Sequence, residues 1–123
     1  MNYNSHPKMK NLYIGIDCHK YKHVATLKNC FNEDLTTITF NNDKNGYDYL
    51  LKTVDKYKGN LIPIYGLEDT KHLGYGLASY LLSKDKIVKC VSSTLTYLER
   101  KRQPTIFKND EYDSKCIAKV LLD

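Results

Sequence analysis

The stretch LYIGIDCHKYKHVATLKNCFNEDLTTITF (residues 12–40) contains three short segments with the pattern of β-strands. In the first, 12–17, apolar side chains alternate with a second face that ends at Asp17. The other two segments are rich in β-branched and aromatic residues and span residues 23–29 and 35–40. Short connections, including the polar turn FNED, join the three segments, so they predict an antiparallel meander.

Beyond this meander the apolar residues change to helical spacing. An amphipathic helix is predicted over 44–58, ending near Gly59, and a buried strand over 61–68, where Pro63 indicates an irregular start. The later segments are a helix over 71–83, a strand over 86–92, a helix near 94–101 and a last helix from 110 to the end. This order, written βββαβαβα with one letter for the final helical segments, predicts an α/β fold with a mixed five-stranded sheet and helices on both faces.

The length and composition indicate a single soluble domain. A chain of 123 residues is long enough to close one hydrophobic core. Its apolar runs are far shorter than the roughly 20 residues that span a bilayer. The N-terminus MNYNSHPKMK lacks the apolar core of a signal peptide, so we expect a cytoplasmic protein.

The cysteines and the net charge indicate the state of the thiols and the kind of partner, but they do not decide the function. Four cysteines are scattered singly without a CxxC pair, which predicts reduced, mostly buried thiols rather than a zinc site or disulfides. A metal site on His19 and His23 is not expected, because their surroundings resemble the start of a strand. The net charge of +5 suits a polyanionic partner such as nucleic acid but does not require one.

Two acidic residues end predicted strands. Asp17 ends the first strand and Glu68 ends the fourth. If these two strands are adjacent and parallel, their ends meet at one edge of the sheet, where ligand sites of open α/β sheets gather. Taken singly, an acid at the end of a strand is more often simply the first residue of a loop.

The last helix carries two acids on its apolar side. Asp110 and Asp113 lie three residues apart and share a face that continues through Ile117, Val120 and Leu121. Buried carboxylates are costly unless a cation neutralises them, so this face predicts metal binding. The alternative is that acids in the first turn cap the helix and interact with its dipole.

Four carboxylates without a convincing nitrogen or sulfur ligand predict a site for Mg²⁺ or Mn²⁺, formed by Asp17, Glu68, Asp110 and Asp113. Two such ions, roughly 3.5–4 Å apart, could activate a nucleophile and stabilise a leaving oxygen in phosphodiester chemistry. Four basic residues between the acids are predicted to contact nucleic-acid phosphates: Arg100, Lys101, Arg102 and Lys108. A solvated basic loop is the alternative interpretation of that stretch.

Three blocks of sequence, in this order and at suitable separations, resemble the DEDD-type insertion-sequence transposases related to Piv DNA invertases. The blocks cover nearly the whole chain and read YIGIDCHKYKHVATL, GLEDTKHLGYGLASYL and KNDEYDSKCIAKVL. In this resemblance, Asp17 matches the aspartate of the family's opening strand and Glu68 matches its glutamate. Asp110 and Asp113 match the two aspartates of its K-T-D-x-x-D-A segment.

The chain departs from the family pattern at three places without losing a carboxylate. Asn109 stands where threonine is usual, and Ser114 stands where alanine is usual. The segment VSS (91–93) replaces the more usual V-N-P, which leaves the turn after the fifth strand open.

The resemblance implies a RuvC-like, RNase H-type catalytic domain over residues 11–123, preceded by a flexible lead-in over residues 1–10. It implies Mg²⁺-dependent DNA strand cleavage and exchange in transposition or inversion, with DNA as a partner and, in some members, a guide (bridge) RNA. Full-length relatives have a C-terminal domain with a serine nucleophile and could form homo-oligomers. The chain is therefore expected to be a fragment that is inactive alone.

Three other functions are weighed against a recombinase domain. The first is a structure-specific nuclease resembling a Holliday-junction resolvase, which cuts branched DNA without a further domain. The second is a non-catalytic nucleic-acid-binding remnant of a mobile element, for which replacing Asp17 or Glu68 with alanine leaves nucleic-acid affinity unchanged or stronger. The third is an actin-like phosphotransferase, which needs further glycine-rich phosphate loops, whereas the chain has six glycines in all.

Overall fold

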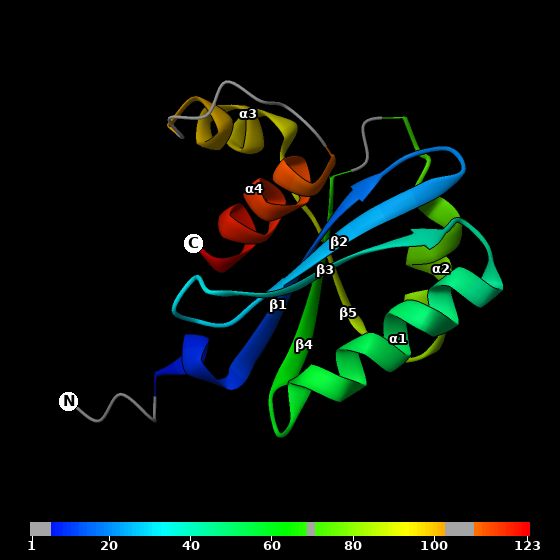
Figure 1. Ribbon diagram of the computed structural model, residues 1–123, viewed down its shortest axis with the longest axis horizontal. Coiled ribbons are helices and arrows are strands. Elements are labelled where there is room, and N and C mark those ends of the chain that lie inside the picture. The colour runs from blue at the N-terminus through cyan, green and yellow to red at the C-terminus, as the bar shows by residue number, and fades with distance from the viewer. Residues whose placement is uncertain (1–5, 69–70, 103–109) are drawn as a thin grey trace.

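A computed structural model describes residues 6–68, 71–102 and 110–123, without the side chain of Asp110 (Figure 1). The strands are β1 (Asn11–Cys18), β2 (Lys22–Lys28), β3 (Asp34–Asn41), β4 (Ile62–Glu68) and β5 (Ile87–Cys90). The helices are a short 3-10 helix η2 (Pro7–Lys10), α1 (Lys44–Lys58), α2 (Tyr75–Ser83), α3 (Ser93–Arg102) and α4 (Asp110–Leu122).

The strands form one mixed sheet in the order β3-β2-β1-β4-β5. β1, β2 and β3 pair antiparallel as the predicted meander, whereas β4 pairs parallel with β1 and β5 pairs parallel with β4. The prediction of an α/β fold with a mixed five-stranded sheet is confirmed. β1 lies at the centre and is buried over seven of its eight residues, which explains its apolar sequence.

Helices cover both faces of the sheet, with α1 and α2 on one side and α4, flanked by α3, on the other (Figure 1). The alternation in β1 determines which side chains meet which helices. Leu12, Ile14 and Ile16 lie in the main core with Leu50 of α1 and Leu77 of α2. The opposite face of β1, which includes Gly15 and Asp17, therefore looks toward α4.

Helix α1 has the bounds that its apolar spacing predicts. The Asp43 carboxylate accepts a hydrogen bond of 2.8 Å from the backbone N–H of Gly46, which satisfies one of the free donors at the helix start. The helix ends at Lys58 and is followed by Gly59, whose φ of 51° lies in the left-handed region that glycine adopts readily. Helical spacing and end signals thus agree in this segment.

Other segments differ from their predicted bounds. Helix α2 begins at Tyr75 rather than at 71, because His72 has a φ of 60° that a right-handed helix excludes. β5 ends at Cys90 because Ser92 caps α3, accepting a hydrogen bond of 3.4 Å from the backbone N–H of Leu95. The serines that replace V-N-P therefore still begin a helix, and the basic residues 100–102 belong to that helix rather than to a loop.

The cysteine prediction is confirmed in part. None of the four cysteines, all of which lie in the described ranges, forms a disulfide. Cys18 and Cys116 are buried, whereas Cys30 is half-buried and Cys90 is exposed. In the part of the chain that the structure describes, no helix is both long and apolar enough to cross a membrane.

Candidate active site

Asp17 and Glu68 lie side by side at the end of the two central parallel strands. They are register partners in the β1–β4 pair, as the sequence predicts for adjacent parallel strands. Both side chains are nearly buried, with 11% of each exposed. The sheet thus holds two carboxylates together at the edge where its parallel strands end.

Helix α4 brings Asp113 to the same edge. The helix packs closely on β1, and an added Cβ at Gly15 would lie only 2.2 Å from the backbone nitrogen of Ala118. Asp113 faces the sheet with 10% of its side chain exposed, and Ile117 on the same face is fully buried. The prediction that this face of the last helix packs on the sheet is therefore confirmed for Asp113, whereas the Asp110 side chain lies outside the described residues.

The serine that replaces the family's usual alanine has a structural partner. The hydroxyl of Ser114 is fully buried and lies 2.7 Å from the hydroxyl of Thr26 on β2. Thr26 in turn lies 2.8 Å from the hydroxyl of Thr37 on β3. These hydrogen bonds link α4 to two strands and fix the helix next to the acidic residues.

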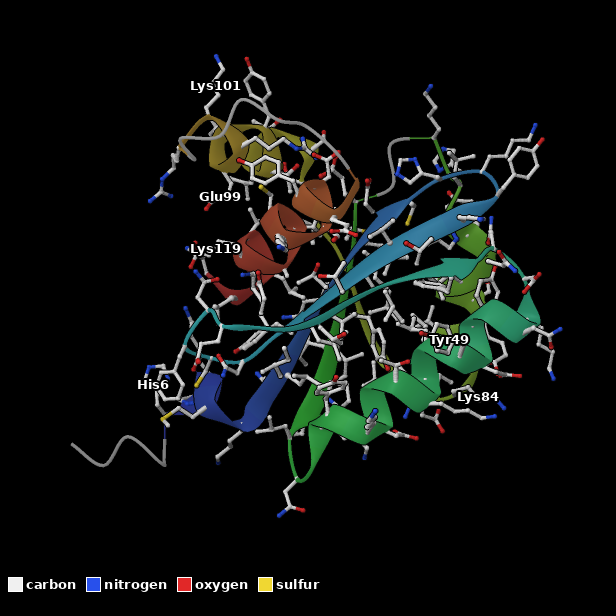
Figure 2. All side chains as sticks on the ribbon, in the orientation of Figure 1. His6, Tyr49, Lys84, Glu99, Lys101 and Lys119 are labelled. Atoms are coloured by element: carbon white, nitrogen blue, oxygen red, sulfur yellow. The ribbon has the colours of Figure 1, made fainter. Side chains whose placement is uncertain are left out.

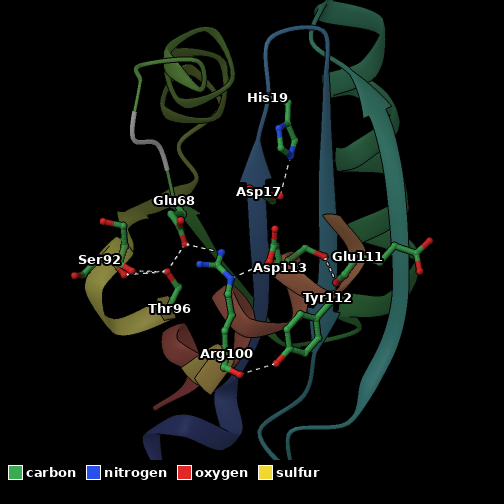
Figure 3. Close-up of polar contacts among 11 residues, drawn as sticks. Asp17, His19, Glu68, Ser92, Thr96, Arg100, Glu111, Tyr112 and Asp113 are labelled. Atoms are coloured by element: carbon green, nitrogen blue, oxygen red, sulfur yellow. Dashed lines mark hydrogen bonds and ion pairs between the residues drawn. The ribbon is translucent and has the colours of Figure 1, made fainter. Parts of the chain in front are cut away.

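Arg100 of α3 lies between two of the acids (Figure 3). Its Nε donates a hydrogen bond of 2.8 Å to Oδ1 of Asp113, and its terminal nitrogen lies 3.5 Å from Oε2 of Glu68. Burial alone would lower the pKa of the Arg100 guanidinium, but the charges of Asp113 and then Glu68 outweigh it and raise that pKa. The guanidinium, 18% exposed, thus neutralises two nearly buried carboxylates.

Two hydroxyl groups support this arrangement. Thr96, fully buried one turn before Arg100 on α3, donates a hydrogen bond to Oε2 of Glu68. The phenol of Tyr112 donates a hydrogen bond of 3.1 Å to the backbone carbonyl of Arg100. Burial, followed by the Cys116 thiol, raises the pKa of Tyr112 to about 12, so the phenol remains a donor at neutral pH. Helices α3 and α4 are therefore tied together beside the acids.

Asp17 has a different partner. The imidazole Nε2 of His19 lies 2.8 Å from Oδ2 of Asp17, and the histidine side chain is 44% exposed. The backbone N–H of His19 donates a hydrogen bond of 3.2 Å to Nδ1 of the buried His23. His19 therefore has a fixed backbone and a half-exposed ring at the outer edge of the site (Figure 3).

The donor chemistry at this edge fits a hard divalent cation, because Asp17, Glu68 and Asp113 supply only carboxylate oxygens. These oxygens, however, are directed at side chains of the chain itself, the Arg100 guanidinium and the His19 imidazole. Among the described side chains, no group of three or more acids, histidines or cysteines could hold a metal ion as they stand. A metal ion would require oxygens of these carboxylates to turn toward a common point.

The other predicted contact residues lie farther out. Lys101 points away from the sheet, with its ammonium 4.8 Å from the centre of the Tyr97 ring (Figure 2). The Arg102 side chain is 72% exposed and lies 3.3 Å from Glu99. Lys108 is outside the described residues. Only Arg100, of the described basic residues predicted to contact nucleic acid, is directed into the acidic site.

Sequence reasoning did not identify Thr96, Arg100 and His19 as partners of the acids. The signals were present but not specific. Thr96 and Arg100 are four residues apart and so share a helix face, while His19 follows Asp17 by two residues, the repeat of an extended chain. The first spacing does not show that this face of the helix lies against Glu68 and Asp113, and the second does not show that the His19 ring contacts Asp17.

A comparison with known protein families shows to which family the chain belongs. A family model described as "Transposase", that of the DEDD insertion-sequence transposases, matches residues 14–123. The chain belongs to the DEDD transposase family. The matched region of this transposase domain includes all four predicted acids and every element from β1 onward except the first residues of β1. A search of curated proteins gives no match for the transposase domain.

Two solved structures resemble the transposase domain distantly. A ROK family transcriptional regulator, a homolog of the E. coli MLC protein, aligns with a TM-score of 0.48 at 10% identity, over 77% of this chain and 31% of the regulator. A ROK family glucokinase from Streptomyces griseus, solved with glucose and AMPPNP, aligns with a TM-score of 0.42 at 13% identity, over 72% of this chain and 35% of the glucokinase. The transposase domain thus spans about a third of the length of each, and neither alignment bears on its function.

Proposed function

We propose that this chain is the RuvC-like, RNase H-type catalytic domain of a DNA transposase or recombinase that cleaves and exchanges DNA strands. The observation that supports this most is the convergence of Asp17, Glu68 and Asp113 at one sheet edge in a chain of the DEDD transposase family. Three nearly buried acids that come together from three separate elements favour one functional site over three independent loop or capping roles.

In this proposal the acids hold Mg²⁺ or Mn²⁺. Asp17, Glu68 and Asp113 would be ligands, with Asp110 as the fourth by its place in the family motif. When bound, the cation supplies Lewis-acid activation of phosphate and of the attacking oxygen. The chain's own contribution is to fix the carboxylates on the rigid ends of β1, β4 and α4, because rigid elements orient ligands better than loops. The guide RNA, the serine nucleophile of a further domain, the homo-oligomer and the cytoplasmic location remain predictions.

The metal proposal is tested by titrating the purified chain with Mn²⁺. Glu68→Gln should weaken binding at least roughly tenfold, since changes even around metal ligands commonly cost 10–100-fold. Electron paramagnetic resonance of free Mn²⁺ measures the affinity directly. Glu111→Gln on the exposed side of α4 is the matched control and should bind as the wild type does. Equal affinities for the two variants would exclude Glu68 from the metal site.

The basic end of α3 is proposed to contact nucleic-acid phosphates beside the acids. The Lys101→Ala, Arg102→Ala double variant should weaken duplex binding and reduce the slope of log affinity against log salt by about 2, roughly 1 per lost phosphate contact. Fluorescence anisotropy at several salt concentrations measures this slope. Lys84→Ala, at the end of α2 on the other face of the sheet, is the control (Figure 2). An unchanged slope in the double variant would remove these residues from the interface.

A further inference from the structure

The positive charge among the acids of this site is supplied by a side chain of the protein, the guanidinium of Arg100. The Arg100 guanidinium is mostly buried, and its nitrogens lie 2.8 Å from an oxygen of Asp113 and 3.5 Å from an oxygen of Glu68. The guanidinium thus lies between two of the proposed metal ligands, Glu68 and Asp113 (Figure 3). Arginine suits this role because its planar guanidinium keeps its charge and presents several donors at fixed angles.

An arginine and a divalent cation cannot use these carboxylates in the same way at once. Oxygen ligands approach Mg²⁺ or Mn²⁺ to about 2.0–2.2 Å and must converge on one point. Here Asp113 Oδ1 is directed at Arg100 Nε, and Glu68 Oε2 is shared between Arg100 and the Thr96 hydroxyl. A cation that takes these oxygens has to break the two ion pairs.

We propose that Arg100 is a built-in counter-ion, which neutralises Glu68 and Asp113 when no divalent cation is bound and must be displaced for one to bind. This inference rests on the proposed function, because it concerns the same acidic site. Arg100 is accordingly a positioning residue: it pairs with two nearly buried carboxylates, and it sets the metal concentration at which the site fills.

The surrounding contacts allow the side chain to leave while its helix stays in place. Tyr112 holds the backbone carbonyl of Arg100, not its guanidinium. When Glu68 turns away, the Thr96 hydroxyl can donate instead to the Ser93 carbonyl within α3, 3.0 Å away. Once displaced, the guanidinium would join Lys101 and Arg102 at the basic end of α3. Release of Arg100 would therefore add a positive charge where phosphate contact is proposed.

The test compares Mn²⁺ affinity between the wild-type chain and Arg100→Met, which keeps a long side chain without the charge. Removing the competitor should tighten Mn²⁺ binding by about tenfold or more, and Mn²⁺ should raise the melting temperature of this variant more than that of the wild type. Arg102→Ala, an arginine of the same helix with a 72% exposed side chain, should bind Mn²⁺ with nearly wild-type affinity. Arg100→Lys keeps the charge but loses the planar guanidinium that contacts both acids. Its Mn²⁺ affinity should lie between those of the wild type and Arg100→Met.

A second measurement needs no variant. The Nε–H of Arg100 donates to Asp113, so its NMR signal should shift and exchange faster with water as Mg²⁺ is added to the wild-type chain. The inference is overturned if that signal does not change while Mg²⁺ saturates the site, or if Arg100→Met binds Mn²⁺ no better than Arg102→Ala. If every variant and the wild type fail to bind Mn²⁺, the proposed metal site fails and the inference fails with it. Tight but equal binding overturns the inference alone.

Discussion

In protein freed of divalent cations, Asp113→Asn is expected to lower the free energy of unfolding by about 3 kcal/mol, a typical loss when one partner of a buried ion pair is removed. The carboxylate accepts the hydrogen bond from Arg100 Nε, and both side chains are mostly buried. Asparagine leaves the guanidinium with Glu68 alone, at 3.5 Å. Urea unfolding with EDTA present measures the change.

Two further variants make this expectation specific to the ion pair. Glu111→Gln lies on the exposed side of the same helix and should change the stability by less than about 0.5 kcal/mol. Asp113→Asn should cost less in an Arg100→Met background than in the wild type, by about 1 kcal/mol or more, because the ion pair that it removes is already absent there. A wild-type stability for Asp113→Asn, or simple additivity in the double variant, would show that the pair is not coupled as its geometry indicates.

Gly15→Ala is expected to destabilise the domain by about 3 kcal/mol, at the upper end of the cost of overpacking a core. The new Cβ would lie 2.2 Å from Ala118 N and 2.6 Å from Ser114 O. Both are backbone atoms of α4, so relief requires the helix to move off β1 and to carry Asp113 with it. Thermal and urea unfolding measure the loss, and Mn²⁺ affinity should fall in parallel.

Gly66→Ala is the matched control, because Gly66 is the register partner of Gly15 on β4. Its added Cβ would lie 2.9 Å from side-chain methyl carbons of Leu121 and Val91 rather than from backbone. Side chains of this kind can repack, so the cost should stay below about 1.5 kcal/mol. Equal losses for the two alanine variants would contradict the view that close backbone contact at Gly15 positions α4.

Much of the scaffold was predictable because local patterns and long-range packing agree. Alternation in residues 12–17 correctly separates the core face from the face that carries Asp17, and the adjacency of β1 and β4 brings Asp17 and Glu68 together. Helical spacing correctly places Asp113 on the sheet side of α4. In each case one periodicity fixes the direction of the side chain.

The partners of the acids could not be predicted in the same way. Whether Arg100 faces solvent or Glu68 depends on how α3 leaves β5, and that turn is set by Ser92 and by the packing of α3 on α4. The sequence shows a basic run, which more often indicates a solvated surface or a phosphate contact than an internal counter-ion. Similarly, the late start of α2 depends on one left-handed residue, His72, which helical periodicity does not reveal.

The central claim is that the acids at this sheet edge form a site for a divalent cation. Crystals of the chain soaked in Mn²⁺ and measured at the manganese absorption edge test it most directly. The account predicts an anomalous peak bounded by Asp17, Glu68 and Asp113, with carboxylate oxygens within about 2.0–2.6 Å and the Arg100 side chain turned away. The contradicting result is full occupancy of the ion elsewhere, or no peak, with Arg100 still paired to Glu68 and Asp113.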